Sequence, residues 1–447
     1  MTDYIVAIDL GTSHITGIVG ERKTDGTFSI VACETEDPLS CIRRGNIYNL
    51  DDTAVHVGNL IKKLEGHLKG GYIDKVYIGV GGQSLRTIDH IESKEIVDGA
   101  TISKDDIEEL KERCEKFIPD LLDVLDIAPA VYYLDGRMDT KPVGVQCKQF
   151  EAHYKLVVGR TSIRRDIINS IRERAGKEVA GIIVSPLAFA DAMLSKEEKE
   201  LGCALVDFGA GVTSISIYKN GELSYMSVIP LGGGLITRDI VSLLLTEAEA
   251  EKLKKERGSA VLIKDDDEVV VRVDMEGSER EILVNDLNAI VEARSKEIVE
   301  NVYARISEVT ELKSLGSGIV LAGCASDLRS LPELIKDKCK VKVRNSAIRG
   351  GLVNGSDDML GNPLYMLAVS LMLKGTEQCV SRPVGTEEPV VDNPSEDEEE
   401  ERNGFFIRKK KKTSKVKEET VEAGNNKKND KTESGIGSFF GRLFDES

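Results

Sequence analysis

The chain has 447 residues, 40% of them hydrophobic, and carries a formal net charge of −17 at pH 7. This length allows about two to three domains of ~100–200 residues, with a hydrophobic core. The negative charge argues against sequence-independent binding to nucleic acid, which requires a basic face, and predicts that an anionic membrane repels the body as a whole.

The cysteines and the first residues predict the compartment. The eight cysteines include no C-x-x-C pair, which is typical of free thiols in a reducing environment. The start, MTDYIVAIDLG, lacks the basic segment of a signal peptide. The longest apolar stretch, 364–373, is far shorter than the ~20 residues that span a bilayer. A cytosolic body is therefore expected.

Strand-like and helix-like segments alternate up to about residue 381, which is typical of an α/β protein. Asn220 and Gly221, between two alternating apolar segments, predict a two-residue β-hairpin. In chain order we expect strands over 3–11, 15–22 and 28–36, a helix over 53–70, strands over 75–82 and 202–209, two strands within 212–230, and a helix over 236–245.

Two phrases of the sequence repeat one pattern. AIDLGTSHITGIV (7–19) and LVDFGAGVTSISI (205–217) each contain an apolar strand that ends in Asp-x-Gly, a turn of small residues, and a second apolar strand. One strand–glycine–strand phrase is common. Two copies, each opening an α/β unit, predict duplicated halves that face each other.

The residues of these loops suit a bound phosphate. Glycine-rich turns offer unobstructed backbone N–H groups to phosphate oxygens, and Thr12, Ser13 and Thr213 add hydroxyl groups. Asp9 and Asp207 would repel phosphate directly but can hold the water ligands of a Mg²⁺ ion that bridges phosphates. The two loops together are expected to clamp a triphosphate. The G-x-x-x-x-G-K-[ST] phosphate loop does not occur.

The composition changes after residue 381. Residues 382–434 are first acidic and then basic, with too few apolar residues for a core, so a disordered linker is predicted. Residues 435–447 predict an amphipathic helix that binds a membrane weakly and reversibly, because its apolar side chains recur at helical spacing and a basic side chain stands among them. The membrane-binding residues are Ile436, Phe439, Phe440, Arg442, Leu443 and Phe444.

Five motifs in order resemble the ATPase superfamily of actin, sugar kinases and heat-shock chaperones. Besides the two loops, residues 178–194 resemble the first connecting helix, 318–334 the adenosine loop, and 361–375 the second connecting helix. Ala250, Glu251, Lys254 and Gly258 match an A-E-x-x-K-x-x-x-G stretch that packs beside the nucleoside in bacterial actins. The resemblance implies an actin-like two-domain α/β fold with duplicated mixed-sheet cores.

Within this superfamily the chain is most similar to the FtsA family of bacterial cell-division proteins. Residues 84–160, with their KPVG turn, resemble a subdomain peculiar to that family, and the linker and amphipathic end also match. The implied parts are a first-half subdomain (1–83), the insertion (84–160), a return to the first half (161–195), the second-half core (196–234), a nucleotide-flanking subdomain (235–310), the adenosine loop and second connecting helix (311–381), the linker (382–434) and the membrane-targeting helix (435–447).

The resemblance implies ATP and Mg²⁺ as cofactors, with Asp9 and Asp207 at the metal. No catalytic residue is assigned. The implied nucleotide-binding residues are Asp9, Gly11, Thr12, Ser13, His14, Asp207, Gly209, Ala210, Gly211, Val212, Thr213, Gly233, Gly234, Glu251, Lys254, Gly323 and Cys324.

Four positions depart from the family pattern. Cys324 replaces the second glycine of the adenosine loop, and Val212 stands where a threonine is common. Ser214 replaces an acidic residue that could orient water, so ATPase activity is expected to be weak at most. His14 occupies a position often held by Lys or Arg, and we expect a structural or weak phosphate contact there rather than catalysis.

The resemblance also implies partners and a location. The C-terminal peptide of the tubulin-like protein FtsZ is expected on residues 235–310, where Arg294 could meet acidic side chains, although an exposed helix arginine is often merely solvated. Self-assembly into filaments, other division proteins on 84–160, and the cytoplasmic face of the cell membrane at mid-cell are implied as well. A sugar or acid kinase is the alternative function, but no carboxylate in the sequence stands out as its general base.

Overall fold

The first half of the chain is built on a six-stranded sheet in the order β13-β7-β1-β2-β3-β21. In this computed structural model, which describes residues 3–38, 40–97, 100–262, 269–275, 278–355 and 357–381, β1, β2 and β3 form an antiparallel meander, and β7 and β13 continue the sheet in parallel with β1. The bounds are β1 Asp3–Leu10, β2 Ile15–Arg22, β3 Phe28–Glu36, β7 Lys75–Val80, β13 Glu178–Val184 and β21 Val353–Asn354.

Helices pack closely on both faces of this sheet. Strand β2 has a glycine at each place where a helix comes near it. A Cβ atom on Gly17 would lie within 3.0 Å of Leu60 and Leu64 of α1 (Leu50–Glu65), and one on Gly20 would collide with Met372 of α11 (Pro363–Met372). Helix α4 (Ser185–Met193) packs on α11. These close contacts fix the helices on the sheet.

The second half repeats this arrangement. Strands β14, β15 and β16 form an antiparallel meander, and β19 and β20 lie in parallel with β14. The order β20-β19-β14-β15-β16 therefore matches β13-β7-β1-β2-β3, which confirms the predicted duplication. The bounds are β14 Cys203–Phe208, β15 Thr213–Lys219, β16 Glu222–Ile229, β19 Gly318–Ala322 and β20 Val343–Asn345.

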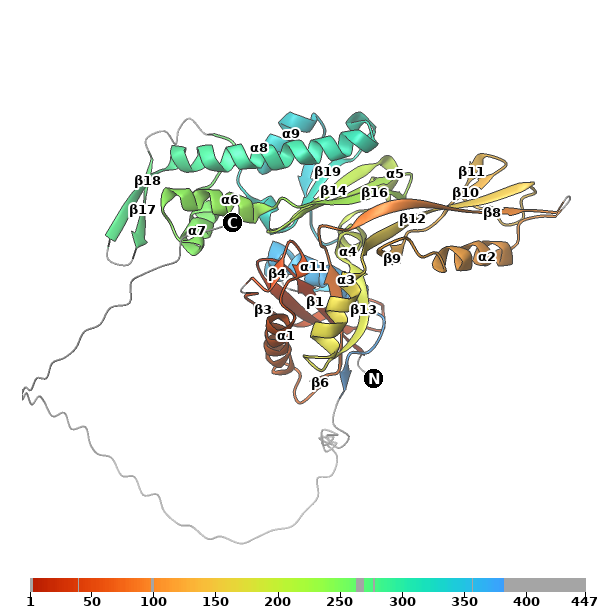
Figure 1. Cartoon of the computed structure of the whole chain (residues 1–447), viewed down its shortest axis with the longest axis horizontal. Coiled ribbons are helices and arrows are strands. Elements are labelled where there is room, and N and C mark those ends of the chain that lie inside the picture. Colours follow the sequence, from red (N-terminus) through yellow and green to blue (C-terminus); the bar gives the residue numbers. More distant parts are fainter. Residues whose placement is uncertain are drawn as a thin grey trace, which may run out of the picture. The chain divides into compact units, whose positions relative to one another are not determined.

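The predicted hairpin at Asn220 and Gly221 is confirmed, since both have positive φ angles, +52° and +86°, as a type I′ turn requires. The helices of this half lie over its sheet and beyond it (Figure 1). They are α6 Gly233–Ile240, α7 Glu247–Arg257, α8 Val284–Val309 and α9 Leu331–Cys339, with the hairpin β17 Val270–Met275 and β18 Ser278–Leu283 before α8.

Residues 84–160 form a subdomain with its own core, in which Phe150 and Leu156 are fully buried. Its sheet also joins the second half: Arg86 pairs with Ser227, and the Thr87 hydroxyl accepts a hydrogen bond from Met226 N (3.0 Å). Figure 1 shows this subdomain extending beside β16. Its elements are β8 Arg86–Glu95, α2 Lys104–Glu115, β9 Leu122–Ile127, β10 Val131–Leu134, β11 Arg137–Asp139 and β12 Gln149–Arg160.

The first connecting helix is shorter than predicted. Residues 178–184 form strand β13, and the helix begins at Ser185, with Pro186 in its first turn. The β-branched residues Val179, Ile182 and Ile183 suit a parallel strand, whereas proline suits a helix start. The expectation of a helix over the whole of 178–194 is therefore wrong for its first seven residues.

Short elements complete the described chain. They are β4 Ile42–Arg43, β5 Asn46–Ile47, β6 Tyr72–Ile73, α3 Ser162–Ile167, the π-helix η1 Ile168–Arg172, α5 Lys196–Leu201, the 3₁₀ turns η2 Val241–Leu243, η4 Leu312–Ser314 and η5 Cys324–Asp327, β21, α10 Asp357–Leu360 and β22 Val380–Ser381. Over these ranges, none of the helices has both the length and the apolar character needed to cross a membrane. The predicted linker 382–434 and helix 435–447 lie outside the described residues.

We predict that Phe150→Ala destabilises the inserted subdomain by about 3–5 kcal/mol, because it leaves a cavity under β8 and β12. Hydrogen–deuterium exchange should then accelerate in β8 and β12 more than in β1 or β14. Ile91→Ala, on the exposed side of the same sheet, is the matched control and should change little. Equal exchange in the two variants would contradict an independent core in this subdomain.

Candidate functional site

The two Asp-x-Gly loops touch each other. The first joins β1 to β2 and the second joins β14 to β15. A Cβ atom on Gly211 would lie 2.5 Å from the Thr12 hydroxyl oxygen, so only glycine allows this approach. The structure therefore brings together the loops that the sequence repeats.

Each loop begins beside a carboxylate at the end of a strand. Asp9 pairs with Gly79 of the parallel strand β7, and Asp207 pairs with Ala322 of the parallel strand β19. Burial, and then the charge of Asp207, raise the pKa of Asp9 to about 7. Burial also raises the pKa of Asp207 to about 6, although the Ser214 hydroxyl lies 3.3 Å from its carboxylate.

This donor set fits a hydrated Mg²⁺ ion. Two partly desolvated carboxylates that repel each other are relieved by a divalent cation. The described residues contain no group of three or more His, Cys, Asp or Glu side chains placed to hold a metal. Water and phosphate oxygens would have to supply the remaining ligands, which is how Mg²⁺ is commonly bound.

The start of α6 supports the second loop through backbone hydrogen bonds. Gly233 N–H donates to Gly209 O (2.9 Å), and Gly234 N–H donates to Ala210 O (2.8 Å). A Cβ atom on Gly232 would collide with the Ala210 carbonyl oxygen at 2.5 Å. Gly233 and Gly234, predicted to bind nucleotide, thus have their N–H groups engaged in supporting the loop.

Lys254 extends this support. Its ammonium group is buried and donates to Glu251 Oε2 (2.6 Å), Thr237 Oγ1 (2.8 Å) and Gly233 O (3.2 Å). Burial lowers the pKa of Lys254, while the charge of Glu251 opposes that shift. The ammonium group points to α6, and Thr237, which the sequence motif does not include, completes the cluster. The predicted nucleotide contact of Lys254 stays a prediction.

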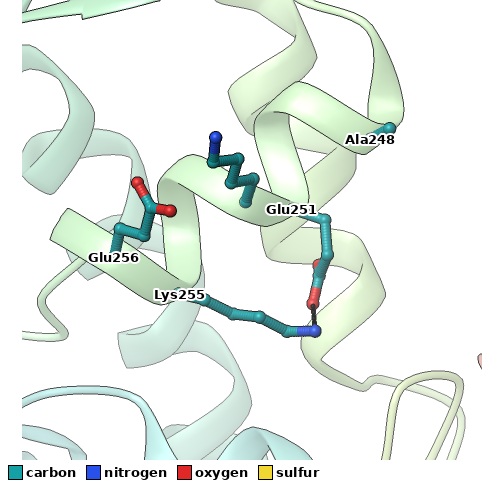
Figure 2. A pocket seen from close by; sticks show the side chains of 5 residues that line it. Ala248, Glu251, Lys255 and Glu256 are labelled. Carbon is teal, nitrogen blue, oxygen red and sulfur yellow. Dashed lines mark ion pairs between the residues drawn. The ribbon is translucent and has the colours of Figure 1, made fainter. Parts of the chain in front are cut away.

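The exposed side of α7 forms a hollow of about 450 Å³. Figure 2 shows Lys255 reaching Glu251, whose Oε1 lies 3.3 Å from Lys255 Nζ. The hollow is lined by Ala248, Glu251, Lys252, Lys255 and Glu256. The motif analysis missed Lys255, although its position four residues after Glu251 is a recognisable helical spacing.

His14 of the first loop lies within electrostatic reach of this hollow. Burial, and then the charge of Lys255, lower the pKa of His14, while Asp37 and Glu251 oppose that shift. The imidazole is therefore neutral near pH 7 and does not replace the Lys or Arg usual at this position. Its Nδ1 lies 3.1 Å from the hydroxyl of the exposed Ser13.

The hydroxyl groups of the two loops differ in orientation. The Thr12 hydroxyl accepts a hydrogen bond from Gly45 N–H (3.1 Å), which leaves its own proton for a ligand. Thr213 is fully buried and donates to Leu231 O (2.8 Å). The hydroxyl proton of Thr213 is thus engaged inside the protein, and its predicted contact with phosphate stays a prediction. Val212 caps the turn by accepting from Gly209 N–H (3.0 Å).

The adenosine loop approaches the second carboxylate. Gly323 has φ +84°, and a Cβ atom there would lie 2.3 Å from Asp207 Oδ1. Cys324 follows with an exposed side chain. Gly323 also borders a cavity of about 170 Å³, which is further lined by Ser326, Asp327, Asn345, Ser346, Gly361, Pro363 and Met366. Most of these residues were not predicted from the sequence, because they come from three separate segments.

Arg294 lies away from the loops, on α8. Its guanidinium donates to both carboxylate oxygens of Asp239 on α6 (2.6 and 3.2 Å) and to Glu297 on its own helix. An acidic peptide would have to compete with these two carboxylates. The predicted peptide contact at Arg294 therefore stays a prediction.

We predict that Asp9→Asn raises the melting temperature at pH 8, without divalent cations, by about 2–4 °C. The folded chain keeps the Asp9 proton at pH values where the unfolded chain has lost it, so stability falls as the pH rises from about 4 through about 7. The gain should shrink towards pH 5 in thermal unfolding scans. Asp120→Asn, at an exposed carboxylate, is the control. A melting temperature of Asp9→Asn at or below wild type throughout this range would refute the assignment.

The comparisons with known proteins agree on one family. Residues 204–370 match the family described as FtsA: Cell division protein FtsA. The chain is 33% identical over 384 residues to Cell division protein FtsA of Porphyromonas gingivalis, covering 85% of this chain and 80% of that protein. It is 30% identical to the Bacillus subtilis protein of the same name, with 83% of each chain covered. The Escherichia coli K12 protein of that name is 26% identical over 388 residues, 83% of this chain and 90% of that one.

A solved structure supports the fold. A chain of the PilM-PilN type IV pilus biogenesis complex superposes with a TM-score of 0.56 at 18% identity, covering 83% of this chain and 98% of that one. This similarity and the duplicated sheets confirm the predicted actin-like two-domain fold. The identity to the relatives above shows that the chain belongs to the FtsA family of cell division proteins.

Proposed function

We propose that this protein binds ATP, polymerises at the cytoplasmic face of the cell membrane at mid-cell, and tethers the FtsZ ring there through its C-terminal amphipathic segment. The observation that carries the proposal is the contact of the two Asp-x-Gly loops beside two buried carboxylates, in a member of a cell division family. That family membership favours a division role over the kinase alternative.

The loops would hold Mg²⁺-ATP between the two halves. Asp9 and Asp207 would hold the water ligands of Mg²⁺, which when bound neutralises phosphate charge. Gly11 and the Thr12 hydroxyl would contact phosphate from one side, and the Gly211 turn from the other. Ser214, rather than a carboxylate, stands beside Asp207. Hydrolysis would therefore be slow, and nucleotide would act as a switch for assembly.

The membrane contact would come from the end of the chain. Ile436, Phe439, Phe440, Leu443 and Phe444 follow the spacing of one helix face. Each apolar side chain contributes at most ~1.5–3 kcal/mol on burial, and ordering the segment costs a comparable amount. One segment therefore binds weakly, and a filament that presents many segments binds through avidity.

Protein partners would use two other surfaces. The FtsZ C-terminal peptide would bind the subdomain around α8, where Arg294 could exchange Asp239 or Glu297 for an acidic group of the peptide. Further division proteins would bind the inserted subdomain. Its exposed apolar residues Val97 and Val143 support that role, with exposed fractions of 80% and 48%.

Co-sedimentation with anionic liposomes tests the proposal. The full chain is compared with a chain that ends at Ser434, each with and without Mg²⁺-ATP. We expect the full chain to pellet at least about fivefold more than the shortened one, and more strongly with Mg²⁺-ATP, because assembly multiplies a weak contact. Phe405→Ser with Phe406→Ser, which removes two apolar residues of the linker, is the control and should pellet like wild type. Equal pelleting of the full and shortened chains would refute membrane attachment through this segment.

A further inference from the structure

An arginine-rich surface stands out on this acidic protein. Residues 160–177 contain six basic and two acidic residues, in a chain with a net charge of −17. The continuous helix α3–η1 buries Ile163, Ile167 and Ile171. Four exposed arginines lie along this helix and just after it, and we call them the arginine face: Arg164, Arg165 and Arg172 in the helix, and Arg174 beyond its end.

Each acidic partner of the three arginines in the helix is at least partly exposed to solvent, with exposed side-chain fractions from 23% for Asp166 to 54% for Glu173. Arg165 pairs with Asp166 (3.1 Å) and Arg172 with Glu173 (2.9 Å), each the next residue in the chain. Arg164 lies 3.9 Å from Asp123. These arginine side chains are 50–68% exposed. Exposed pairs of this kind are weak and screened by salt, so their guanidinium groups can exchange a carboxylate for another anion.

Arg174 is tied more firmly to the body. Its Nε donates to Asp51 (2.6 Å) and its Nη1 donates to Asn169 O (2.9 Å). This residue anchors the end of η1 beside α1. It is therefore left unchanged in the test below.

The segment that follows the arginine face lies next to the strand pair β6–β22, where the described residues end. Strand β22 pairs with β6 through Ser381 and Tyr72. Lys177, three residues after Arg174, donates to Ile73 O of β6 (2.6 Å). Tyr72 is itself 57% exposed, and an exposed tyrosine among basic residues is typical of surfaces that meet the headgroup region of a bilayer.

We propose that the arginine face docks against the anionic phospholipid headgroups of the membrane, as a second contact beside the C-terminal segment. Arginine suits this role because its planar guanidinium binds phosphate through two parallel hydrogen bonds. The inference rests on the proposed membrane function, since the C-terminal segment would supply the first membrane contact. The net charge alone predicts that an anionic membrane repels the body as a whole. On this proposal the arginine face is attracted to the bilayer, although the body is acidic.

The occupant is a lipid surface rather than a soluble acidic peptide. Three exposed arginines of this face lie on one short helix, where they can meet several phosphates of a surface at once. A bound C-terminal segment would also keep the region around Ser381 near the bilayer. An acidic peptide would lack that local concentration.

The test measures binding of the full chain to vesicles of phosphatidylglycerol and phosphatidylcholine, and to vesicles of phosphatidylcholine alone. The face variant is Arg164→Ser, Arg165→Ser and Arg172→Ser. The matched control is Arg305→Ser, Lys313→Ser and Lys336→Ser, which removes the same charge from exposed residues of the second half. A third variant, Arg164→Lys, Arg165→Lys and Arg172→Lys, keeps the charge.

We expect the face variant to bind anionic vesicles at least about fivefold more weakly than wild type, and the lysine variant to recover most of that loss. The control should stay close to wild type, and binding to neutral vesicles should not distinguish the variants. Equal losses in the face variant and the control would overturn the inference, as would no loss at all. Circular dichroism and Mg²⁺-ATP binding of each variant verify that it is folded.

The chain that ends at Ser434 distinguishes a failure of this inference from a failure of the proposed function on which it rests. If that chain loses vesicle binding while the face variant keeps it, the arginine face plays no part and the proposed anchor stands. If the shortened chain binds as well as the full chain, the proposed anchor fails. A loss in the face variant but none in the shortened chain would then assign the membrane contact to the body alone.

Discussion

The burial of two neighbouring carboxylates, Asp9 and Asp207, is the constraint on which the rest of this structure depends. Two carboxylates at the ends of equivalent strands are held where burial disfavours their charge, and the pKa of Asp9 rises to about 7. Such an arrangement costs stability unless a cation relieves it. The fold maintains it through glycines that have no room for a side chain, above all Gly211 against Thr12 and Gly323 against Asp207.

A series of hydrogen bonds supports this site. Lys254 holds the start of α6 through the carbonyl of Gly233, and Gly233 in turn holds the second loop through the carbonyl of Gly209. The buried ammonium group thus supports the second loop through the backbone. A ligand that pulled the loops together would move α6 and α7 with them, and α8 is tied to α6 by Arg294 and Asp239.

Much of the fold could be predicted from the sequence because the same strand–loop–strand pattern occurs in both halves of the chain. The two strand–loop–strand phrases and the Asn220-Gly221 turn follow from local patterns, whereas the insertion at 84–160 was predicted from the resemblance to the family. The helix start at Ser185 could not be placed, because a short apolar run reads equally well as a buried strand or a helix. The pairing of Arg86 with Ser227 was also unpredictable, since no local pattern specifies contacts between distant strands.

The sequence identified many of the residues that lie at the candidate site, but not the direction in which their side chains point. The aspartates and the glycines meet as expected. Thr213 and Lys254 belong to the right motifs, yet their polar atoms turn inward to Leu231 and Gly233. The direction of a side chain depends on neighbours from other segments, which a motif does not record. Lys255 was missed for the same reason, since only the fold brings it near His14.

The measurement that tests the central claim most directly is the affinity of the full chain for ATP, by isothermal titration calorimetry, in Mg²⁺ and in EDTA. If the two carboxylates and two loops form one Mg²⁺-nucleotide site, wild type should bind at least about tenfold more tightly in Mg²⁺, a difference of about 1.4 kcal/mol. Asp207→Asn should lose that dependence. Equal affinity in Mg²⁺ and EDTA, or an unchanged Mg²⁺ dependence in Asp207→Asn, would contradict the account.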